Sequence, residues 1–257
     1  MVSSPNCREE LLLQKLLVCK RLSAQEAMDL LNVSKSTIRR IFIDMENRGT
    51  VIRAHGGIQL TSSIRYSFND SKTRYSAEKI RIGKAACNLL SEDDVIFIDA
   101  GTTSMYFAVQ LIQMLSNNSI SVKSIFTNSV ALLDIFPANI NIGLIGGVYR
   151  PERKDLYGYL ATLAVGHLHF SKCFLGTDGI INDCGFGAID SSTAEMNLRL
   201  LDSASERIVL CDHSKFQNSC HVAWASFSEI NTVITDTDAK NEDIKKLQAY
   251  GCNVILA

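Results

Sequence analysis

The chain has 257 residues, of which 46% are hydrophobic and 21% charged, with fifteen glycines and three prolines. This composition excludes a collagen-like chain, a disordered protein and a coiled-coil rod, and the length suits one large domain or a small domain joined to a medium one. No apolar run approaches the ~18 residues that a membrane helix needs, and Glu9 and Glu10 interrupt the segment where a signal peptide would lie. We therefore expect a cytoplasmic protein with no membrane partner.

The net charge of −1 is unevenly distributed along the chain. Residues 1–60 carry nine Lys and Arg against six Asp and Glu, a net charge of +3, whereas the remainder has a net charge of −4. A small basic part on a mildly acidic body is typical of a protein in which only one part meets a polyanion.

The first sixty residues predict a helix-turn-helix. Apolar residues recur at three- and four-residue steps over residues 7–20, which predicts a first helix. Ser23 and Glu26 have the spacing of a capping box, which predicts the start of a second helix. After a tight break at residues 32–33, Ser34 can cap a third helix, and two helices joined by so short a turn are typical of this motif.

The third predicted helix carries three cations, Lys35, Arg39 and Arg40, near its start and among short hydroxyl side chains. Such a helix suits the major groove of DNA, where arginine makes bidentate contacts to guanine while lysine, serine and threonine hold phosphates. Beyond it, residues 50–53 and 55–59 predict a two-stranded wing. A solvated helix face is the alternative interpretation, but fold, spacing and charge agree on DNA binding. The predicted DNA contacts are Ser34, Lys35, Ser36, Thr37, Arg39, Arg40, Arg53 and His55.

Residues 61–76 are polar and without periodicity, which predicts a linker between a DNA-binding domain at residues 1–60 and an effector-binding domain at residues 77–257. Beyond the linker, helical and strand-like segments alternate, which indicates an α/β domain with a parallel sheet. The predicted strands are residues 95–99, 122–127, 141–145, 173–175, 208–211, 233–235 and 254–256, and the first predicted helices are residues 77–90, 103–115 and 129–135.

Loops that follow the predicted strands define a candidate effector site, because ligands of parallel sheets bind beyond the carboxyl ends of the strands. The loop at residues 99–103 has a glycine for close approach and hydroxyls at the positive end of a helix, which predicts an anion cradle. Each loop alone is typical of an ordinary turn, but three at successive strand ends indicate a site. Lys215 would supply a charge for a phosphate, and Asp99, Asn128 and Asp178 would bind sugar hydroxyls. The predicted effector contacts are Asp99, Gly101, Thr102, Thr103, Thr127, Asn128, Gly146, Gly147, Asp178 and Lys215.

The sequence predicts no cofactor and no metal. The loop at residues 99–103 is neither a Walker A loop nor a Gly-x-Gly-x-x-Gly fingerprint, so nothing indicates a nucleotide. Eight cysteines at wide separations without a C-x-x-C pair predict reduced, buried thiols. His167 and His169 have the spacing of metal ligands without a third ligand, which favours a surface or interface pair.

The segments Val33–Arg40 and Arg53–Gly57 resemble the N-terminal signature of the DeoR/GlpR family of bacterial sugar-metabolism repressors. The family usually continues its Arg-Arg pair with Asp-Leu, where this chain has Ile41-Phe42, and this leaves open which of Arg39 and Arg40 contacts a base. The remainder resembles the effector domain of the family in Glu78-Lys79, Asp99–Thr103, Thr127–Ser129, Gly146-Gly147, Gly158, Phe174–Gly176, Asp212–Phe216 and Thr235-Asp236.

The resemblance implies a winged helix-turn-helix repressor of a carbohydrate-utilisation operon, whose operator affinity responds to a phosphorylated sugar or polyol, and a C-terminal fold similar to ribose-5-phosphate isomerase. The alternative is a sugar-phosphate isomerase with an accessory DNA-binding head, for which Asp178, Asp183, Glu195 and Lys215 are the candidates. The isomerase pattern has further acids at the positions that are Ile180, Ile181 and Asn182 in this chain. Because none of these three residues is an acid, we expect a binding site without catalytic residues. One DNA-binding domain contacts too little of the groove to be selective. We therefore expect a homo-oligomer assembled through the α/β domain, which brings two or more DNA-binding domains to the operator.

Overall fold

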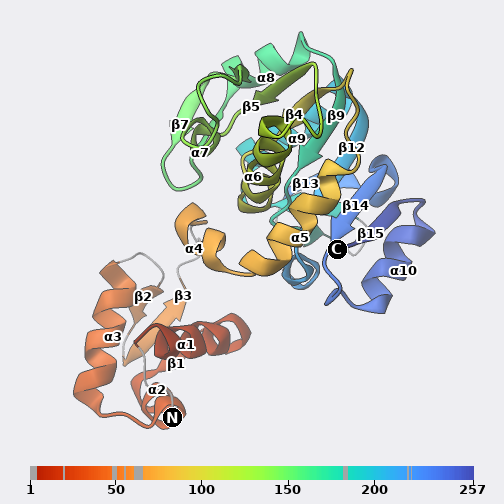
Figure 1. The fold of residues 1–257 in the computed structure, drawn as a ribbon. Coiled ribbons are helices and arrows are strands. Elements are labelled where there is room, and N and C mark those ends of the chain that lie inside the picture. Colours follow the sequence, from red (N-terminus) through yellow and green to blue (C-terminus); the bar gives the residue numbers. More distant parts are fainter. Residues whose placement is uncertain are drawn as a thin grey trace. The chain divides into compact units, whose positions relative to one another are not determined.

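The computed structural model describes residues 5–19, 21–47, 51–54, 56–60, 66–181, 185–218, 220 and 222–257. Its contacts divide the chain into two compact units, Met1–Tyr66 and Ser67–Ala257, each of which is described by itself (Figure 1). None of the described helices combines the length and the apolar character that a membrane span requires.

The N-terminal unit is a winged helix-turn-helix. Its elements are α1 (Pro5–Cys19), β1 (Arg21–Ser23), α2 (Ala24–Leu31), α3 (Lys35–Asn47), β2 (Val51–Ala54) and β3 (Gly57–Leu60). The wing strands β2 and β3 are antiparallel as predicted, and β3 also pairs with β1, a short strand that the sequence did not predict. A Cβ atom on Gly57 would overlap the carbonyl oxygen of Leu22, so glycine is what permits this second pairing.

Local signals at the turn of this motif are confirmed. Ser23 Oγ accepts a hydrogen bond from the Glu26 N–H at 3.2 Å, and the Glu26 carboxylate accepts one from the Ser23 N–H at 2.8 Å. Asn32 ends α2 in the left-handed conformation with φ of 52°, and its N–H donates to the carbonyl of Met28. The turn brings α3 against α2, and both helices bury apolar residues in a core with α1 and the wing.

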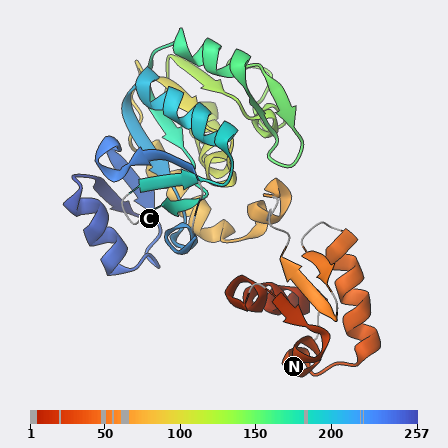
Figure 2. The ribbon, with the colours of Figure 1, turned by 180° about the vertical axis from the view of Figure 1, so that it is seen from behind.

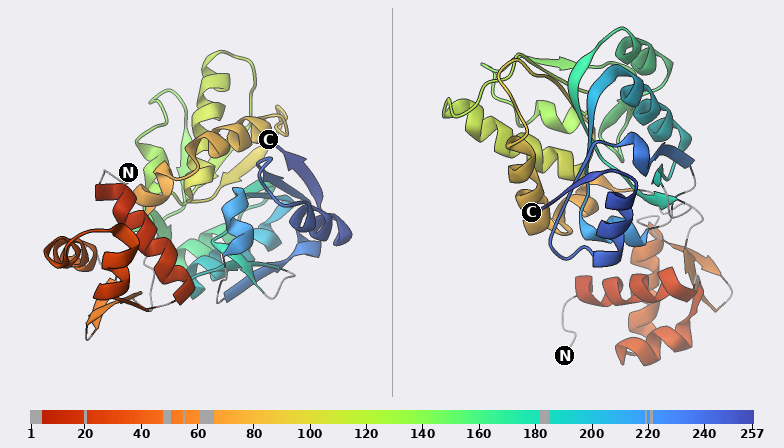
Figure 3. Two further views of the ribbon diagram at one scale, coloured as in Figure 1. Left: turned by 90° about the horizontal axis from the view of Figure 1, so that it is seen from below. Right: turned by 90° about the vertical axis from the view of Figure 1, so that its right-hand side faces the viewer.

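The C-terminal unit is an α/β domain built on a seven-stranded sheet with the order β15-β14-β12-β9-β4-β5-β6. Every pairing within this sheet is parallel, as the alternating pattern predicts. Its strands are β4 (Val95–Ile98), β5 (Ser124–Thr127), β6 (Ile142–Leu144), β9 (Phe170–Leu175), β12 (Ala204–Leu210), β14 (Thr232–Thr235) and β15 (Asn253–Leu256). The edge strand β15 lies beside the last helix, α10 (Asn241–Ala249) (Figure 3).

Helices cover the two faces of this sheet because successive strand side chains point to opposite sides. Phe174 of β9 packs against Phe107, with 4.4 Å between the ring centroids, on the face covered by α6 (Thr102–Ser116) and α5 (Ser76–Cys87). Its neighbour Cys173 belongs to the core on the other face, with α8 (Tyr159–Gly166) and α9 (Ser191–Ser203), which lie side by side (Figure 2). Cys87, Cys173, Cys211, Cys220 and Cys252 are buried free thiols, and Cys19 is exposed.

Two smaller sheets were not predicted. One is antiparallel, with the order β10-β11-β13, and consists of β10 (Gly179–Ile181), β11 (Gly185–Ala188) and β13 (Val222–Ser226). The other is the hairpin of β7 (Val148–Arg150) and β8 (Asp155–Tyr157). The remaining short elements are α7 (Val130–Leu133), which is shorter than predicted, and the turns η1 (His213–Gln217) and η2 (Phe227–Glu229).

The predicted linker, residues 61–76, is too long. The structure places a helix, α4 (Phe68–Thr73), inside this range, and α5 begins at Ser76 rather than at residue 77. Phe68 is buried in the C-terminal unit, its N–H donates to the carbonyl of Glu152, and Ser67 caps the helix by accepting from the Asp70 N–H. A helix of six residues is too short to show periodicity, so tertiary burial of Phe68 decides its conformation.

Candidate functional site

The predicted recognition helix α3 presents its cations to solvent. Ile38 is buried in the core of the N-terminal unit, whereas Lys35, Arg39 and Arg40 are exposed. Neither Arg39 nor Arg40 forms an ion pair or hydrogen bond with any residue that the structure describes. Both guanidinium groups thus lie on the exposed face of α3.

The first turn of α3 gathers the predicted hydroxyls. Ser34 Oγ lies 2.9 Å from Ser36 Oγ and 3.0 Å from Thr37 Oγ1, and it accepts a long hydrogen bond, 3.4 Å, from the Thr37 N–H. Ile41 and Phe42, which replace the usual Asp-Leu of the family, are both buried. This chain therefore has no acid at that point to compete with DNA for the arginines.

The wing contributes Arg53, which α3 holds in place. Its N–H donates to the Glu46 carboxylate at 3.4 Å, and its guanidinium lies 4.0 Å from the same group. Arg53 is about half exposed, so an ion pair this loose leaves it accessible. His55, the other predicted wing contact, lies outside the described residues.

The start of α6 is the best-formed part of the candidate effector site. Gly101 is the N-cap residue of α6 and has no side chain that could accept a hydrogen bond. The first amides of a helix have no intrahelical acceptor, and here they receive no side-chain cap either. The Thr102 and Thr103 hydroxyls make no hydrogen bond within the described parts of the chain, and the Ser104 hydroxyl is fully buried without a partner. An unpaired buried polar group costs about 1–3 kcal/mol, and the N-terminus of a helix favours an anion.

Thr127 and Asn128 reach the same edge, but their side chains are used within the protein. Thr127 Oγ1 donates to the last carbonyl of β4 at 2.6 Å and accepts from the Ser129 N–H at 3.0 Å. Asn128 Oδ1 accepts from the Ala100 N–H at 3.1 Å, and its Nδ2 donates to the Leu156 carbonyl at 3.2 Å. These bonds hold the loops after β4 and β5 against β8, so both side chains position the start of α6.

Asp99 joins the loops that follow β4 and β9. One carboxylate oxygen accepts from the Ala100 N–H at 2.7 Å and the other from the Gly176 N–H at 3.0 Å. Burial raises the pKa of Asp99 to about 6, although these two amides act in the opposite direction.

The raised pKa of Asp99 predicts a pH dependence of stability. The folded state binds a proton at Asp99 below about pH 6, whereas the unfolded state does so only below ~3.9, so the stabilisation present at low pH is lost as the pH rises through 6. Between pH 4 and 7 the wild-type free energy of unfolding should fall by roughly 2–3 kcal/mol relative to that of Asp99→Asn. Urea unfolding of both proteins measures this difference, and a difference that does not change with pH would contradict it.

Gly146 and Gly147 differ in what surrounds them. A Cβ atom on Gly147 would overlap the carbonyl oxygen of Tyr157 and lie 3.2 Å from Ala161 Cβ, whereas Gly146 faces open space. Gly147 thus packs the hairpin against α8, and Gly146 keeps the edge of the sheet free of a side chain.

A charged network beside this edge includes Asp178 and four residues that the sequence analysis did not select. Arg150 donates to Asp155 Oδ1 and to Asp190 Oδ1, each at 2.8 Å. Arg153 donates to Asp178 Oδ2 at 2.6 Å, and its Nε lies 3.2 Å from Asp190 Oδ2. The Arg-x-x-Arg-x-Asp spacing after the glycine pair was the signal that could have indicated this network. Asp178, predicted to bind a sugar hydroxyl, is already held by Arg153.

Lys215 lies on η1, next to the segment that carries Asp178. η1 packs against β10, and the Asn218 side chain donates to the Asp178 carbonyl at 3.4 Å. Lys215 is half-buried. The structure therefore brings Lys215 to the Asp178 side of the site, where a positive charge would favour a phosphate.

Lys79, which the resemblance singled out with Glu78, connects this region to α4. Its buried ammonium donates to the carbonyls of Ser71 and Arg74, each at 2.6 Å, and lies 3.8 Å from the buried carboxylate of Asp212. Burial lowers the pKa of Lys79 to about 8, although Asp212 acts against this shift. Lys79 thereby links the first helix of the C-terminal unit to the residue that precedes η1.

Of the remaining predicted candidates, none that the structure describes forms a hydrogen bond or ion pair with this network. Glu195 is exposed on α9, and Asp183 lies outside the described residues. His169 Nε2 is 3.0 Å from Ser205 Oγ, and both His167 and His169 are exposed.

Among the residues that the structure describes, one group of side chains has ligand atoms close enough for a metal ion: His213, Asp236 and Asp238. The buried Asp236 carboxylate already accepts from the His213 N–H at 2.8 Å and from the Asp238 N–H at 3.0 Å, and it lies 2.9 Å from His213 Nδ1. These bonds involve both carboxylate oxygens. Asp236 therefore stabilises the turn at His213 and the turn at Asp238.

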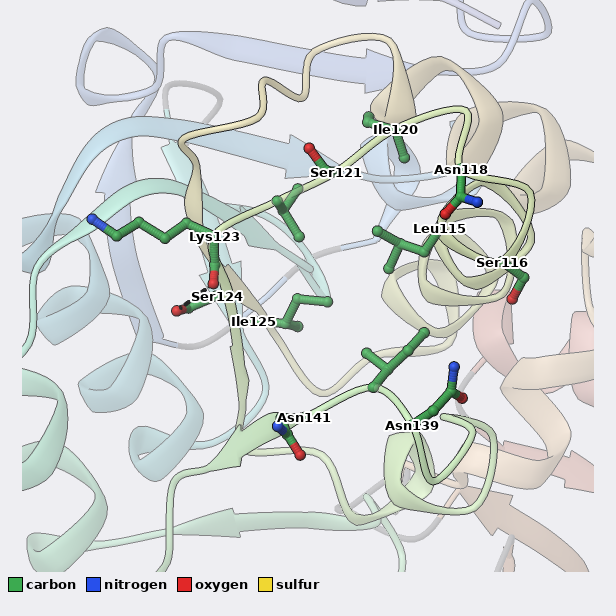
Figure 4. A pocket seen from close by; sticks show the side chains of 12 residues that line it. Leu115, Ser116, Asn118, Ile120, Ser121, Lys123, Ser124, Ile125, Asn139 and Asn141 are labelled. Atoms are coloured by element: carbon green, nitrogen blue, oxygen red, sulfur yellow. Dashed lines mark hydrogen bonds between the residues drawn. The ribbon is translucent and has the colours of Figure 1, made fainter.

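A pocket of about 370 Å³ lies at the opposite, amino-terminal edge of the sheet (Figure 4). The end of α6 and the segments before β5 and β6 line it, and Lys123 is its one charged lining residue. Figure 4 shows the Lys123 side chain pointing away from Leu115 and Ile125. Because parallel sheets bind ligands at the carboxyl edge, we do not assign the effector to this pocket.

A winged helix-turn-helix with an exposed cationic helix, joined to an α/β unit built on a parallel sheet, is the organisation of a DNA-binding transcriptional regulator with a separate sensor domain. Residues 8–64 match the family model of the DeoR-like helix-turn-helix domain, and residues 74–237 match that of the DeoR C terminal sensor domain. The chain belongs to the DeoR family of transcriptional regulators.

Individual relatives agree with this assignment. The chain is 31% identical to the HTH-type transcriptional regulator FruR of Bacillus subtilis, over 83% of this chain and 84% of the relative. It is 29% identical to the lactose phosphotransferase system repressor of Staphylococcus aureus, over 88% and 89%. Among solved structures, a D-ribose-5-phosphate isomerase in complex with phospho-erythronic acid is 18% identical, with a TM-score of 0.41, over 55% of this chain and 54% of that chain.

Proposed function

We propose that this protein represses a carbohydrate-utilisation operon and releases its operator when a phosphorylated sugar or polyol binds the C-terminal unit. The α3 helix and the wing contact the operator through the residues predicted from the sequence. Relatives named as repressors, including one of a lactose phosphotransferase system, support both the sign of regulation and a sugar-derived effector. Because its partner is DNA, we place its action in the cytoplasm.

The observation that carries this proposal is the start of α6. The first amides of α6 and the hydroxyls of Thr102, Thr103 and Ser104 have no side-chain partner among the described residues, and Arg153 lies close enough to Asp99 to act on its pKa. A phosphate accepts hydrogen bonds from such donors, and Lys215 adds a positive charge from the Asp178 side. Thr127 and Asn128 support the cradle rather than contact the effector.

We propose that the site binds without catalysis. An isomerase needs a carboxylate that is free to move a proton, but Arg150 and Arg153 hold Asp155, Asp178 and Asp190 as ion pairs. Binding acts on the operator only if the effector has different affinities for the DNA-competent and DNA-incompetent states, and such coupling is typically about 1–3 kcal/mol.

Thermal shift of the full chain with a panel of phosphosugars and inorganic phosphate tests this proposal. A ligand that binds only the folded state raises the melting temperature, and the same ligand should release labelled operator DNA. Thr102→Val and Ser104→Ala should each weaken effector binding by about 10- to 150-fold, because a hydrogen bond to a charged group contributes about 1.5–3 kcal/mol.

Thr232→Val is the matched control, because Thr232 is buried at the opposite, amino end of β14. It should leave the response unchanged, and all three variants should bind the operator normally without ligand. If no phosphosugar raises the melting temperature, or if both cradle variants release DNA at wild-type effector concentrations, the proposal is wrong.

A further inference from the structure

An apolar stripe runs along the outer face of α8. The helix sequence, YLATLAVG, contains no charged residue. Its inner residues Ala161 and Val165 are fully buried in the core, whereas Tyr159 is 75% exposed, Leu160 67% and Leu163 44%. A helix that is apolar on all sides is normally buried on all sides, but no described segment of the C-terminal unit covers the outer face of α8.

The stripe belongs to a larger surface, which we call the α8 patch. It consists of Tyr159, Leu160 and Leu163 of α8 and Val148 of the hairpin strand β7, all exposed by two-fifths or more. α9 packs against α8, and the hairpin packs against α8 through Gly147 and Ala161. Together these side chains form an exposed apolar surface, and such a surface marks an interaction site in a soluble protein.

The charges beside the patch favour a second copy of the same chain as its partner. α9 carries exposed Glu195, Arg199 and Asp202 next to the apolar stripe, and the Arg199 guanidinium lies against Gly166 of α8. Within one chain Arg199 reaches Asp202 only at 3.9 Å, and both side chains are largely exposed. In a twofold interface, a residue that contacts a second residue of the other copy is matched by the reverse contact, so a helix that carries both signs of charge can complement its copy.

We propose that the α8 patch is the surface through which two copies of this chain pair about a twofold axis, with Leu160 and Leu163 at its centre. The proposal rests on the proposed function in one respect: a regulator that binds two operator half-sites needs two DNA-binding domains. It also places the dimer contact on the hairpin that carries Arg150, next to the candidate effector edge. Effector binding at that edge can therefore change the pairing of the two copies.

Sedimentation velocity of the full chain over a range of concentrations tests the proposal. The wild-type protein should sediment as a dimer or an even-numbered oligomer, and the double substitution Leu160→Glu/Leu163→Glu should raise the dimer dissociation constant at least 100-fold. Leu133→Glu is the matched control, because Leu133 is 40% exposed on α7, outside the patch. Trp224, the one tryptophan of the chain, is buried in the C-terminal core and reports whether each variant is folded.

A charge exchange tests the choice of partner. Arg199→Glu should weaken the dimer, and adding Asp202→Arg to it should restore pairing, which a surface for an unrelated protein would not do. A monomeric wild-type protein, or a folded Leu160→Glu/Leu163→Glu variant that remains dimeric, would overturn the proposal. Phosphosugar-induced thermal shifts of the monomeric variant separate this result from the proposed function, because the effector cradle lies within one chain.

Discussion

Replacing Arg153 by methionine should lower the free energy of unfolding of the C-terminal unit by about 3–5 kcal/mol, the usual cost of removing one partner of a buried ion pair. Arg153 and Asp178 are each only 7% exposed in their side chains, and their closest atoms are 2.6 Å apart. Without the guanidinium, the Asp178 carboxylate keeps the Ile189 N–H as a donor but loses its compensating charge. Urea unfolding followed by the fluorescence of Trp224 reports on this unit.

Two further variants show whether charge is the cause. Adding Asp178→Asn to Arg153→Met should recover part of the loss, because the buried carboxylate is then neutral. Arg81→Met should change stability by less than about 1 kcal/mol, because the ion pair of Arg81 with Glu78 at 3.9 Å and its hydrogen bond to the Ala257 carbonyl at 3.2 Å are both exposed. If Arg153→Met unfolds at the wild-type urea concentration, the network has no structural role.

The double substitution Arg39→Ala/Arg40→Ala should abolish selective operator binding, with a loss of about 2–6 kcal/mol, because each arginine that contacts a base contributes about 1–3 kcal/mol. Both side chains are exposed on α3 and have no partner within the described residues. Fluorescence anisotropy with operator and scrambled DNA at several salt concentrations measures the effect.

The single variants distinguish the two arginines, which the sequence left open. Substitution of a base-reading arginine should relax specificity at one base pair, whereas substitution of a phosphate-binding arginine should weaken all DNA equally and reduce the salt slope by about 1. Lys84→Ala removes one positive charge from the exposed surface of α5 and should leave operator affinity unchanged. Wild-type affinity in the double variant would exclude α3 as the recognition helix.

Most of the fold could be predicted because its signals are local or periodic. The capping box at Ser23 and the left-handed Asn32 involve residues a few positions apart, and their geometry follows from backbone chemistry alone. The strands of the parallel sheet are short, apolar and separated by helices, so their alternation indicates their class. The helix α4 and the hairpin β7–β8 were missed because they are short and are stabilised by contacts with distant segments.

In the candidate site, too, features that depend on nearby residues were predicted and features that depend on distant residues were not. The glycine and hydroxyls at residues 101–103 were predicted because a strand end and a helix start place them at the carboxyl edge. The roles of Thr127 and Asn128 could not be predicted, since their partners belong to other loops. The same holds for Arg153, whose partner Asp178 is 25 residues away.

The sequence by itself determined the family, the two-unit organisation and the helix-turn-helix, because each depends on spacing within short segments. Only the tertiary structure decided which polar groups are left without partners, which acids the arginines hold and which face of α8 remains uncovered. These properties depend on pairs of groups that folding brings together from distant segments, and the free energy of a buried charge or an apolar surface is defined only by its neighbours.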